Sequence, residues 1–222
     1  MSELRLDFRT GAAGGEASLW MAAAARLPRL ARLELCVAEG EDGGACFRGP
    51  RFEGPGRGRA CAALVREWLR PCARLEHLRL SMAGFGLGLD QVVAAAAEGL
   101  AVQTSLTSLA MGWGDAHGLP ADTASAARAL AGLRRLPALR SLALELAPFA
   151  AAPDSELPPV APPLGALLAA LPELRGACPA LAAVSVKLRR PRDGADAAAA
   201  EACVEAARAA NPEPRISFEF CS

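Results

Sequence analysis

Two residues of this chain carry the groups that nucleophilic catalysis uses, a thiol and an imidazole. Cys36 directly follows the segment LARLEL, and His77 lies within the segment LEHLRL. A thiol becomes a nucleophile when an imidazole lies within hydrogen-bond reach and a third group orients that imidazole. If the two segments are adjacent strands, both side chains fall on one face but in different columns. A thiol-dependent activity is therefore one hypothesis from the enzyme class.

The other chemistry-bearing patterns are incomplete. Asp115 and His117 are two residues apart and can share the rim of a loop. The segment GPGRGRA at 54–60 lacks the Lys-Ser/Thr ending of a phosphate-binding loop, and no strand leads directly into it. No two Cys or His residues have the spacing of zinc ligands. We therefore expect no catalytic residue, no metal site, no cofactor and no enzyme activity.

Bulk properties exclude several classes of partner. The 24 basic and 24 acidic residues give a formal net charge of zero, so nothing in the overall electrostatics favours nucleic acid or an acidic membrane. One local group of arginines (Arg48, Arg51, Arg57 and Arg59) is nearly cancelled by Glu39, Glu41, Asp42 and Glu53. We expect neither nucleic acid nor a membrane as a partner.

The expected compartment is cytoplasmic or nuclear. No stretch of 18 apolar residues lacks a charge or a proline, so no membrane span is expected. The segment MSELRLDFRTG has no basic region followed by an apolar one, as a secretory signal would. The seven cysteines contain no CxxC pair, and we interpret them as reduced thiols, mostly packed as small hydrophobic residues.

A short apolar phrase recurs along the chain, with a leucine, two residues, a second leucine and then a third apolar residue two positions later. Its alternating apolar positions are typical of a strand. Five clear copies lie at 30–35, 75–80, 106–111, 139–144 and 181–186, with weaker ones at 3–8 and 214–220. The equivalent positions Leu4, Leu33, Leu78, Leu109, Leu142, Val184 and Ile216 are 29 to 45 residues apart. Such internal repetition predicts a solenoid.

Segments rich in Ala and Leu separate the phrases, and their apolar residues recur every three or four positions, which predicts helices. They are 16–27, 59–70, 90–102, 122–136, 163–176 and 195–210. Asp90 and Asp122 are the expected N-caps, and Pro172 is expected to kink or interrupt the fifth helix. Loop insertions are expected at about 38–58 and 148–163, within a single domain covering 1–222.

The pattern within each strand predicts on which side the helices lie. Strands connected through a helix must run parallel. Helices on both faces would make each strand apolar throughout, whereas residues such as Arg5, Glu34 and Arg79 separate apolar neighbours. We therefore expect an α/β solenoid, with about seven parallel strands on a concave face and six helices on the convex face.

At these phrases the chain resembles the leucine-rich-repeat family, in particular the irregular long repeats of ribonuclease-inhibitor-like and F-box-associated proteins. The resemblance covers nearly the whole chain and implies a horseshoe. The family pattern continues to an asparagine or cysteine after each strand, where this chain has Ala38, Ala83, Gly114, Ala147 and Arg189. The turns after the strands must therefore satisfy their backbone groups in another way.

In-register strands would place three columns of side chains on the concave face. Charges would alternate near both ends of the sheet, the middle would be small and uncharged, and Trp113 would rim that middle part. Cross-strand pairs that merely keep the sheet soluble are the alternative interpretation. The expected partner-binding residues are Arg32, Glu34, His77, Arg79, Ser108, Ala110, Trp113, Ser141, Glu145 and Lys187.

The sequence thus leads to a non-enzymatic scaffold that binds another protein on its concave face. The alternative is the substrate-recognition part of an F-box-type ubiquitin ligase, with the F-box outside this chain. The thiol hypothesis on Cys36 and His77 is the third. Because the first and last elements are both predicted strands, self-association through an exposed sheet edge is a further hypothesis.

Overall fold

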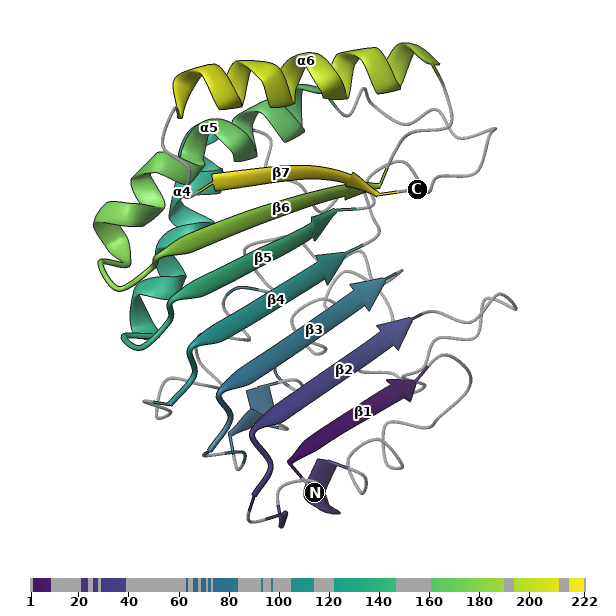
Figure 1. The fold of residues 1–222 in the computed structure, drawn as a ribbon, viewed down its shortest axis with the longest axis vertical. Coiled ribbons are helices and arrows are strands. Elements are labelled where there is room, and N and C mark those ends of the chain that lie inside the picture. Colours follow the sequence, from purple (N-terminus) through teal and green to yellow (C-terminus); the bar gives the residue numbers. More distant parts are fainter. Residues whose placement is uncertain are drawn as a thin grey trace.

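Seven parallel strands form one sheet, and their order in space equals their order in the sequence (Figure 1). The structure is a computed structural model. It describes residues 2–8, 21–23, 26–27, 29–38, 63, 66–67, 69–70, 72, 74–83, 93, 97, 105–113, 122–146, 161–189, 194–211 and 216–221. The strands are β1 (Glu3–Phe8), β2 (Arg32–Ala38), β3 (His77–Ala83), β4 (Ser108–Trp113), β5 (Ser141–Leu146), β6 (Ala183–Arg189) and β7 (Ile216–Cys221). The predicted parallel α/β sheet is confirmed.

Each strand has one side that faces the core. Along β5, half-buried and buried residues alternate, and the buried ones are Leu142, Leu144 and Leu146. Equivalent residues on neighbouring strands are Cα partners, so they form continuous rows across the sheet. The row through Leu142 consists of the residues that the sequence aligned, Leu4, Leu33, Leu78, Leu109, Leu142, Val184 and Ile216.

The first leucine of each clear phrase lies in the turn before its strand, so the strands begin two residues later than the phrases. In four repeats its backbone N–H donates to a carbonyl three residues earlier, which closes the turn. The four donor–acceptor pairs are Leu30 with Leu27, Leu75 with Cys72, Leu139 with Leu136, and Leu181 with Cys178. The repeated structural unit is therefore longer than the phrase and includes this turn.

Two cysteines replace leucine at the acceptor position of that turn. Cys72 and Cys178 are both buried, and burial raises the pKa of the Cys72 thiol to about 11 and that of Cys178 in the same direction. A thiol that stays protonated packs as a small hydrophobic residue. The interpretation of these two cysteines as core residues is thus confirmed, and Cys36 and Cys203, which are half-buried, are likewise free of disulfides.

Three α-helices and one 3-10 helix are fully described. They are α4 (Thr123–Ala131), the 3-10 helix η4 (Gly132–Arg135), α5 (Ala161–Ala177) and α6 (Gly194–Ala210). The count differs from the six predicted helices, because 16–27, 59–70 and 90–102 lie mostly outside the described residues. Asp90 and most of the predicted insertions at 38–58 and 148–163 also lie outside the described residues. No helix in the described part of the chain is long and apolar enough to cross a membrane.

Two details of the predicted helices need correction. The helix expected over 122–136 begins as predicted, with the Asp122 carboxylate accepting from the Ser125 N–H over 2.8 Å, but its α-helical part ends at Ala131. The change to the 3-10 turn Gly132–Arg135 comes at a glycine, which is a poor helix former. A β-carbon at Gly132 would lie 3.1 Å from Val93, so this position is also crowded for a larger residue. Of the kink or interruption expected at Pro172, the interruption is absent. This proline is exposed within a continuous α5, whose buried leucines hold the helix on the core.

The described helices cover one side of the sheet, and the other side faces the viewer in Figure 1. Apolar residues of α4 at i, i+3 and i+4 (Ala126, Ala129 and Leu130) are buried, and α5 buries Leu164, Leu167, Leu168, Leu171 and Leu174. None of the described helices lies over the opposite side. The parallel sandwich with helices on both faces is therefore not the arrangement of this part of the chain.

Helix α6 also reaches the outer strand of the sheet. The Arg208 guanidinium donates to the Phe218 carbonyl over 3.1 Å, lies 5.9 Å from the centroid of the Phe218 ring and pairs with Glu205. A backbone carbonyl oxygen has two lone pairs, and this contact occupies one of those of Phe218. Edge-mediated self-association at β7 stays a prediction.

The two sides of the sheet should respond differently to truncation. Leu142→Ala removes a fully buried side chain and should lower the free energy of unfolding by roughly 2–5 kcal/mol. Ser185→Ala on the opposite side should change it by less than about 0.5 kcal/mol. Urea denaturation measures both values, and a large loss for Ser185→Ala would mean that the two sides are assigned the wrong way round.

Candidate functional site

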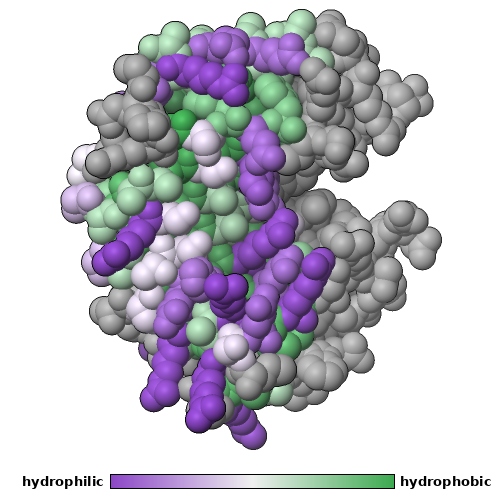
Figure 2. All heavy atoms as spheres, in the orientation of Figure 1, coloured by the Kyte–Doolittle hydropathy of each residue, from purple (hydrophilic) through white to green (hydrophobic). Residues whose placement is uncertain are grey.

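The uncovered side of the sheet, here called the open face, is turned toward the viewer in Figure 2. The strand register is the predicted one and places three columns of residues on this face. The middle column is Arg5, Glu34, Arg79, Ala110, Ala143, Ser185 and Ser217. The column nearer the strand starts is Glu3, Arg32, His77, Ser108, Ser141 and Ala183. The column nearer the strand ends is Asp7, Cys36, Ser81, Gly112, Glu145, Lys187 and Glu219. Of the predicted binding residues, all except Trp113 lie in these columns.

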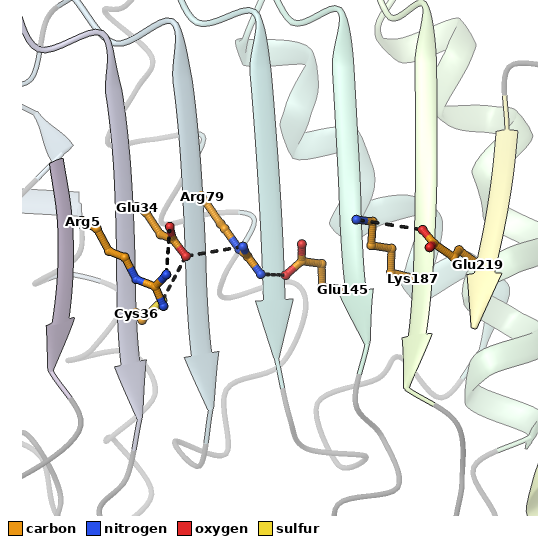
Figure 3. A network of polar contacts seen from close by, with 7 residues as sticks. All are labelled: Arg5, Glu34, Cys36, Arg79, Glu145, Lys187 and Glu219. Atoms are coloured by element: carbon orange, nitrogen blue, oxygen red, sulfur yellow. Dashed lines mark hydrogen bonds and ion pairs between the residues drawn. The ribbon is translucent and has the colours of Figure 1, made fainter. Parts of the chain in front are cut away.

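Ion pairs cross the open face from strand to strand (Figure 3). Glu34 on β2 forms ion pairs with both neighbouring strands, with Arg5 Nη1 at 3.8 Å from one carboxylate oxygen and Arg79 Nη1 at 3.4 Å from the other. At the far end, Lys187 Nζ lies 4.0 Å from Glu219 Oε2. The alternation that the sequence predicted across the first three strands, and the pairing of Lys187 with Glu219, are therefore present.

The shortest pair on this face skips a strand. Arg79 Nη2 donates to Glu145 Oε2 over 2.6 Å, although β4 lies between β3 and β5. The bridge passes over Gly112, where an added β-carbon would lie 3.3 Å from Ser81 Oγ and 3.6 Å from Glu145 Oε2. Because the strand between them carries only Ala110 and Gly112 here, the two charges meet above it, and Gly112 is buried on an otherwise open face.

Arg79 is thereby the central charge in a series of ion pairs that runs from Arg5 through Glu34 and Arg79 to Glu145. Partial burial lowers its pKa, but the hydrogen bond to Glu145 and the charges of Glu145 and Glu34 raise it more, so the net pKa is raised. Beside it, the Cys36 thiol donates to Glu34 over 3.7 Å. These ion pairs form one connected network of charges that spans five strands, from β1 to β5.

Sequence analysis missed the Arg79–Glu145 pair because it compared charges only on neighbouring strands. The signal was nevertheless present in the columns. Two small residues, Ala110 and Gly112, separate Arg79 from Glu145 and leave room for long side chains to meet across β4. A search for opposite charges on either side of a small-residue strand would have found it.

The catalytic hypothesis is not supported by the register. Cys36 pairs with Ser81, which is four residues along β3 from His77. At ~3.3 Å per residue this offset is about 13 Å, too far for a thiol and an imidazole to share a proton. Asp115, His117 and the segment 54–60 lie outside the described residues. Among the residues that are described, no three His, Cys, Asp or Glu side chains gather as metal ligands would.

The middle of the open face is less smooth than expected. Ser108, Ala110, Ser141 and Ala143 are half-buried small residues, as a close-approach surface needs, but the Arg79–Glu145 pair crosses the Gly112 end of this patch. Trp113 is the last residue of β4 rather than a residue beyond it. Its Cα register partner on β5 is Leu146, so Trp113 lies outside the three columns, and its role at the binding face stays a prediction.

Comparison of the chain with protein-family models, with curated proteins and with solved structures finds no match. The geometry and charges of the open face are therefore the features from which a function is inferred.

Double-mutant cycles should rank the two ion pairs by geometry. The Arg79–Glu145 pair, at 2.6 Å and connected to Glu34, should show a coupling energy of about 1 kcal/mol at low salt. The Lys187–Glu219 pair, at 4.0 Å and more exposed, should show about 0.2 kcal/mol. Urea denaturation of the single and double alanine variants gives both numbers. Equal couplings would contradict the bridge over β4.

Proposed function

We propose that the chain is a leucine-rich-repeat-type scaffold, without enzymatic activity, that binds another protein on its open face. The observation that carries this proposal is the one-sided burial of the sheet. Among the described residues, apolar rows occupy one side of the sheet and α4, α5 and α6 lie on that side, while polar and small residues line the other. A sheet face that no described element covers is a surface on which a second molecule can pack.

We further propose that the sheet curves as in a horseshoe, with the open face on the concave side. The sequential order of parallel strands and the placement of the described helices on one side support this. In such a solenoid each repeat contacts only its neighbours, so the equivalent side chains of successive strands combine into one extended surface.

The open face has the size of a protein-binding site. Seven strands at ~4.8 Å spacing span roughly 29 Å, and strands of six or seven residues are about 20 Å long. The resulting ~600 Å² approaches the ~800 Å² per partner of a standard protein–protein interface. The face is thus large enough for a specific complex.

The charges of this face favour selection of a partner by pattern. Arg5, Glu34, Arg79 and Glu145 already neutralise one another, so a partner gains little from simple attraction. A partner with a mismatched charge would leave one of these groups unpaired, which costs free energy. Half-buried small residues between them allow a close approach.

Site-specific photo-crosslinking tests the proposal. A photoreactive amino acid replaces Ala143 on the open face or, as a matched control, the exposed Ala202 on α6. In cells of the source organism, position 143 should form a discrete adduct with another protein, and position 202 should not. The same adducts from both positions, or none from position 143, would contradict the proposal. A ubiquitin-ligase adaptor in the adduct would instead favour the F-box alternative.

A further inference from the structure

The outermost strand β7 has apolar side chains that the sheet covers only in part (Figure 1). Ile216, Phe218 and Phe220 continue the three rows of core residues, and their Cα partners on β6 are all buried. On β7 the same rows are only partly buried, because β6 lies along one edge of the strand and no described strand lies along the other. The apolar rows are thus unfinished at this edge of the sheet.

The backbone of β7 is placed to pair with one more strand. An edge strand presents N–H and C=O groups that an added strand can bond, while the side chains of the added strand alternate between the two faces. Helix α6 belongs to the helix layer, because its Ala200, Val204 and Ala207 are buried in the core cluster. An added strand would therefore extend the sheet in front of that layer and cover the half-exposed rows.

A second copy of this chain can supply the strand in two simple ways, and the charges distinguish them. If β1 of the second copy continued the register of the repeats, Asp7 would lie beside Glu219, since both belong to the column nearer the strand ends. Like charges directly opposite each other destabilise a sheet. Such head-to-tail pairing would also leave an edge free on each added copy and grow into an open filament.

The other way is antiparallel pairing with β7 of the second copy. With Phe218 opposite Phe218, Ile216 faces Phe220 and Ser217 faces Glu219, each twice because of the two-fold symmetry. Core-side residues then meet only core-side residues, and aromatic and aliphatic pairs of this kind stabilise antiparallel strands. Ser217 and Glu219 are both exposed, so the hydroxyl of one copy can donate to the carboxylate of the other. No like charges are opposed.

We propose that β7 pairs antiparallel with β7 of a second copy of this chain, in the register centred on Phe218, and forms a closed two-fold dimer. One strand of six residues per copy is about 20 Å long and contributes less than the ~800 Å² per partner of a standard interface, so the dimer dissociates reversibly. The pairing joins the two sheets with both open faces on the same side. Two identical faces can then bind a partner that carries two copies of the recognised surface, which raises the overall affinity.

Sedimentation velocity at increasing protein concentration, up to about 100 µM, tests the proposal. The parent should show a monomer–dimer equilibrium that stops at two copies. Ser217→Glu opposes two pairs of like charges, since each new carboxylate faces Glu219 of the other copy, and should weaken the dimer about fivefold. Ser217→Lys creates two pairs of opposite charges at the same place and should strengthen the dimer by a similar factor.

The matched controls are Ser185→Glu and Ser185→Lys. Ser185 is the Cα partner of Ser217 on β6, so these variants carry the same changes of charge one strand away from the edge. They should leave the dissociation constant unchanged, and circular dichroism checks that every variant is folded. Amide hydrogen exchange locates the contact, since protection of β7 should increase with protein concentration and protection of β1 should not.

Four results would overturn the inference. They are a parent that stays monomeric at every concentration, growth beyond two copies, equal effects of the substitutions at 185 and 217, and concentration-dependent protection of β1 in place of β7. The inference uses only the edge of β7 and is independent of the proposed function. Crosslinking from position 143 to another protein therefore stays a separate test of the open face.

Discussion

The structure depends on the stacking of two-sided strands in one register. Leu142 and Leu144 face the helices while Ala143 and Glu145 face outward, and their neighbours on β4 and β6 do the same. A shift of one residue in any pairing would turn a whole row of buried side chains to solvent, so burial specifies the register strongly. The same backbone hydrogen bond closes the turn before each of four strands, so these strands begin at equivalent positions.

The polar groups of the open face follow from that register. Once the apolar rows are aligned, Arg5, Glu34 and Arg79 must be neighbours, and Arg79 must face Glu145 across the small residues of β4. None of these half-exposed pairs is worth much stability individually. Their consequence is a fixed charge pattern on a surface that the core holds rigid.

The sheet and the residues of its open face could largely be predicted from the sequence, because the alternation of apolar and polar residues along a strand indicates which side is buried. The strands, their parallel order and the three columns needed only the leucine phrases. Features that depend on contacts between elements distant in the sequence could not be predicted from this alternation. Val93 approaches Gly132, where the α-helix changes to a 3-10 turn, and the Arg79–Glu145 pair passes over Gly112, which has no side chain.

The most direct test of one-sided burial is a cysteine scan of β5, with labelling by a maleimide and peptide mapping by mass spectrometry. Residues 141–175 contain no native cysteine, lysine or internal arginine, so an introduced thiol there is read in a single tryptic peptide. Labelling should alternate, fast at Ser141→Cys, Ala143→Cys and Glu145→Cys, and slow at Leu142→Cys and Leu144→Cys, in variants confirmed as folded. Uniformly slow labelling at all five positions would mean that the outward face is covered, and would contradict the account.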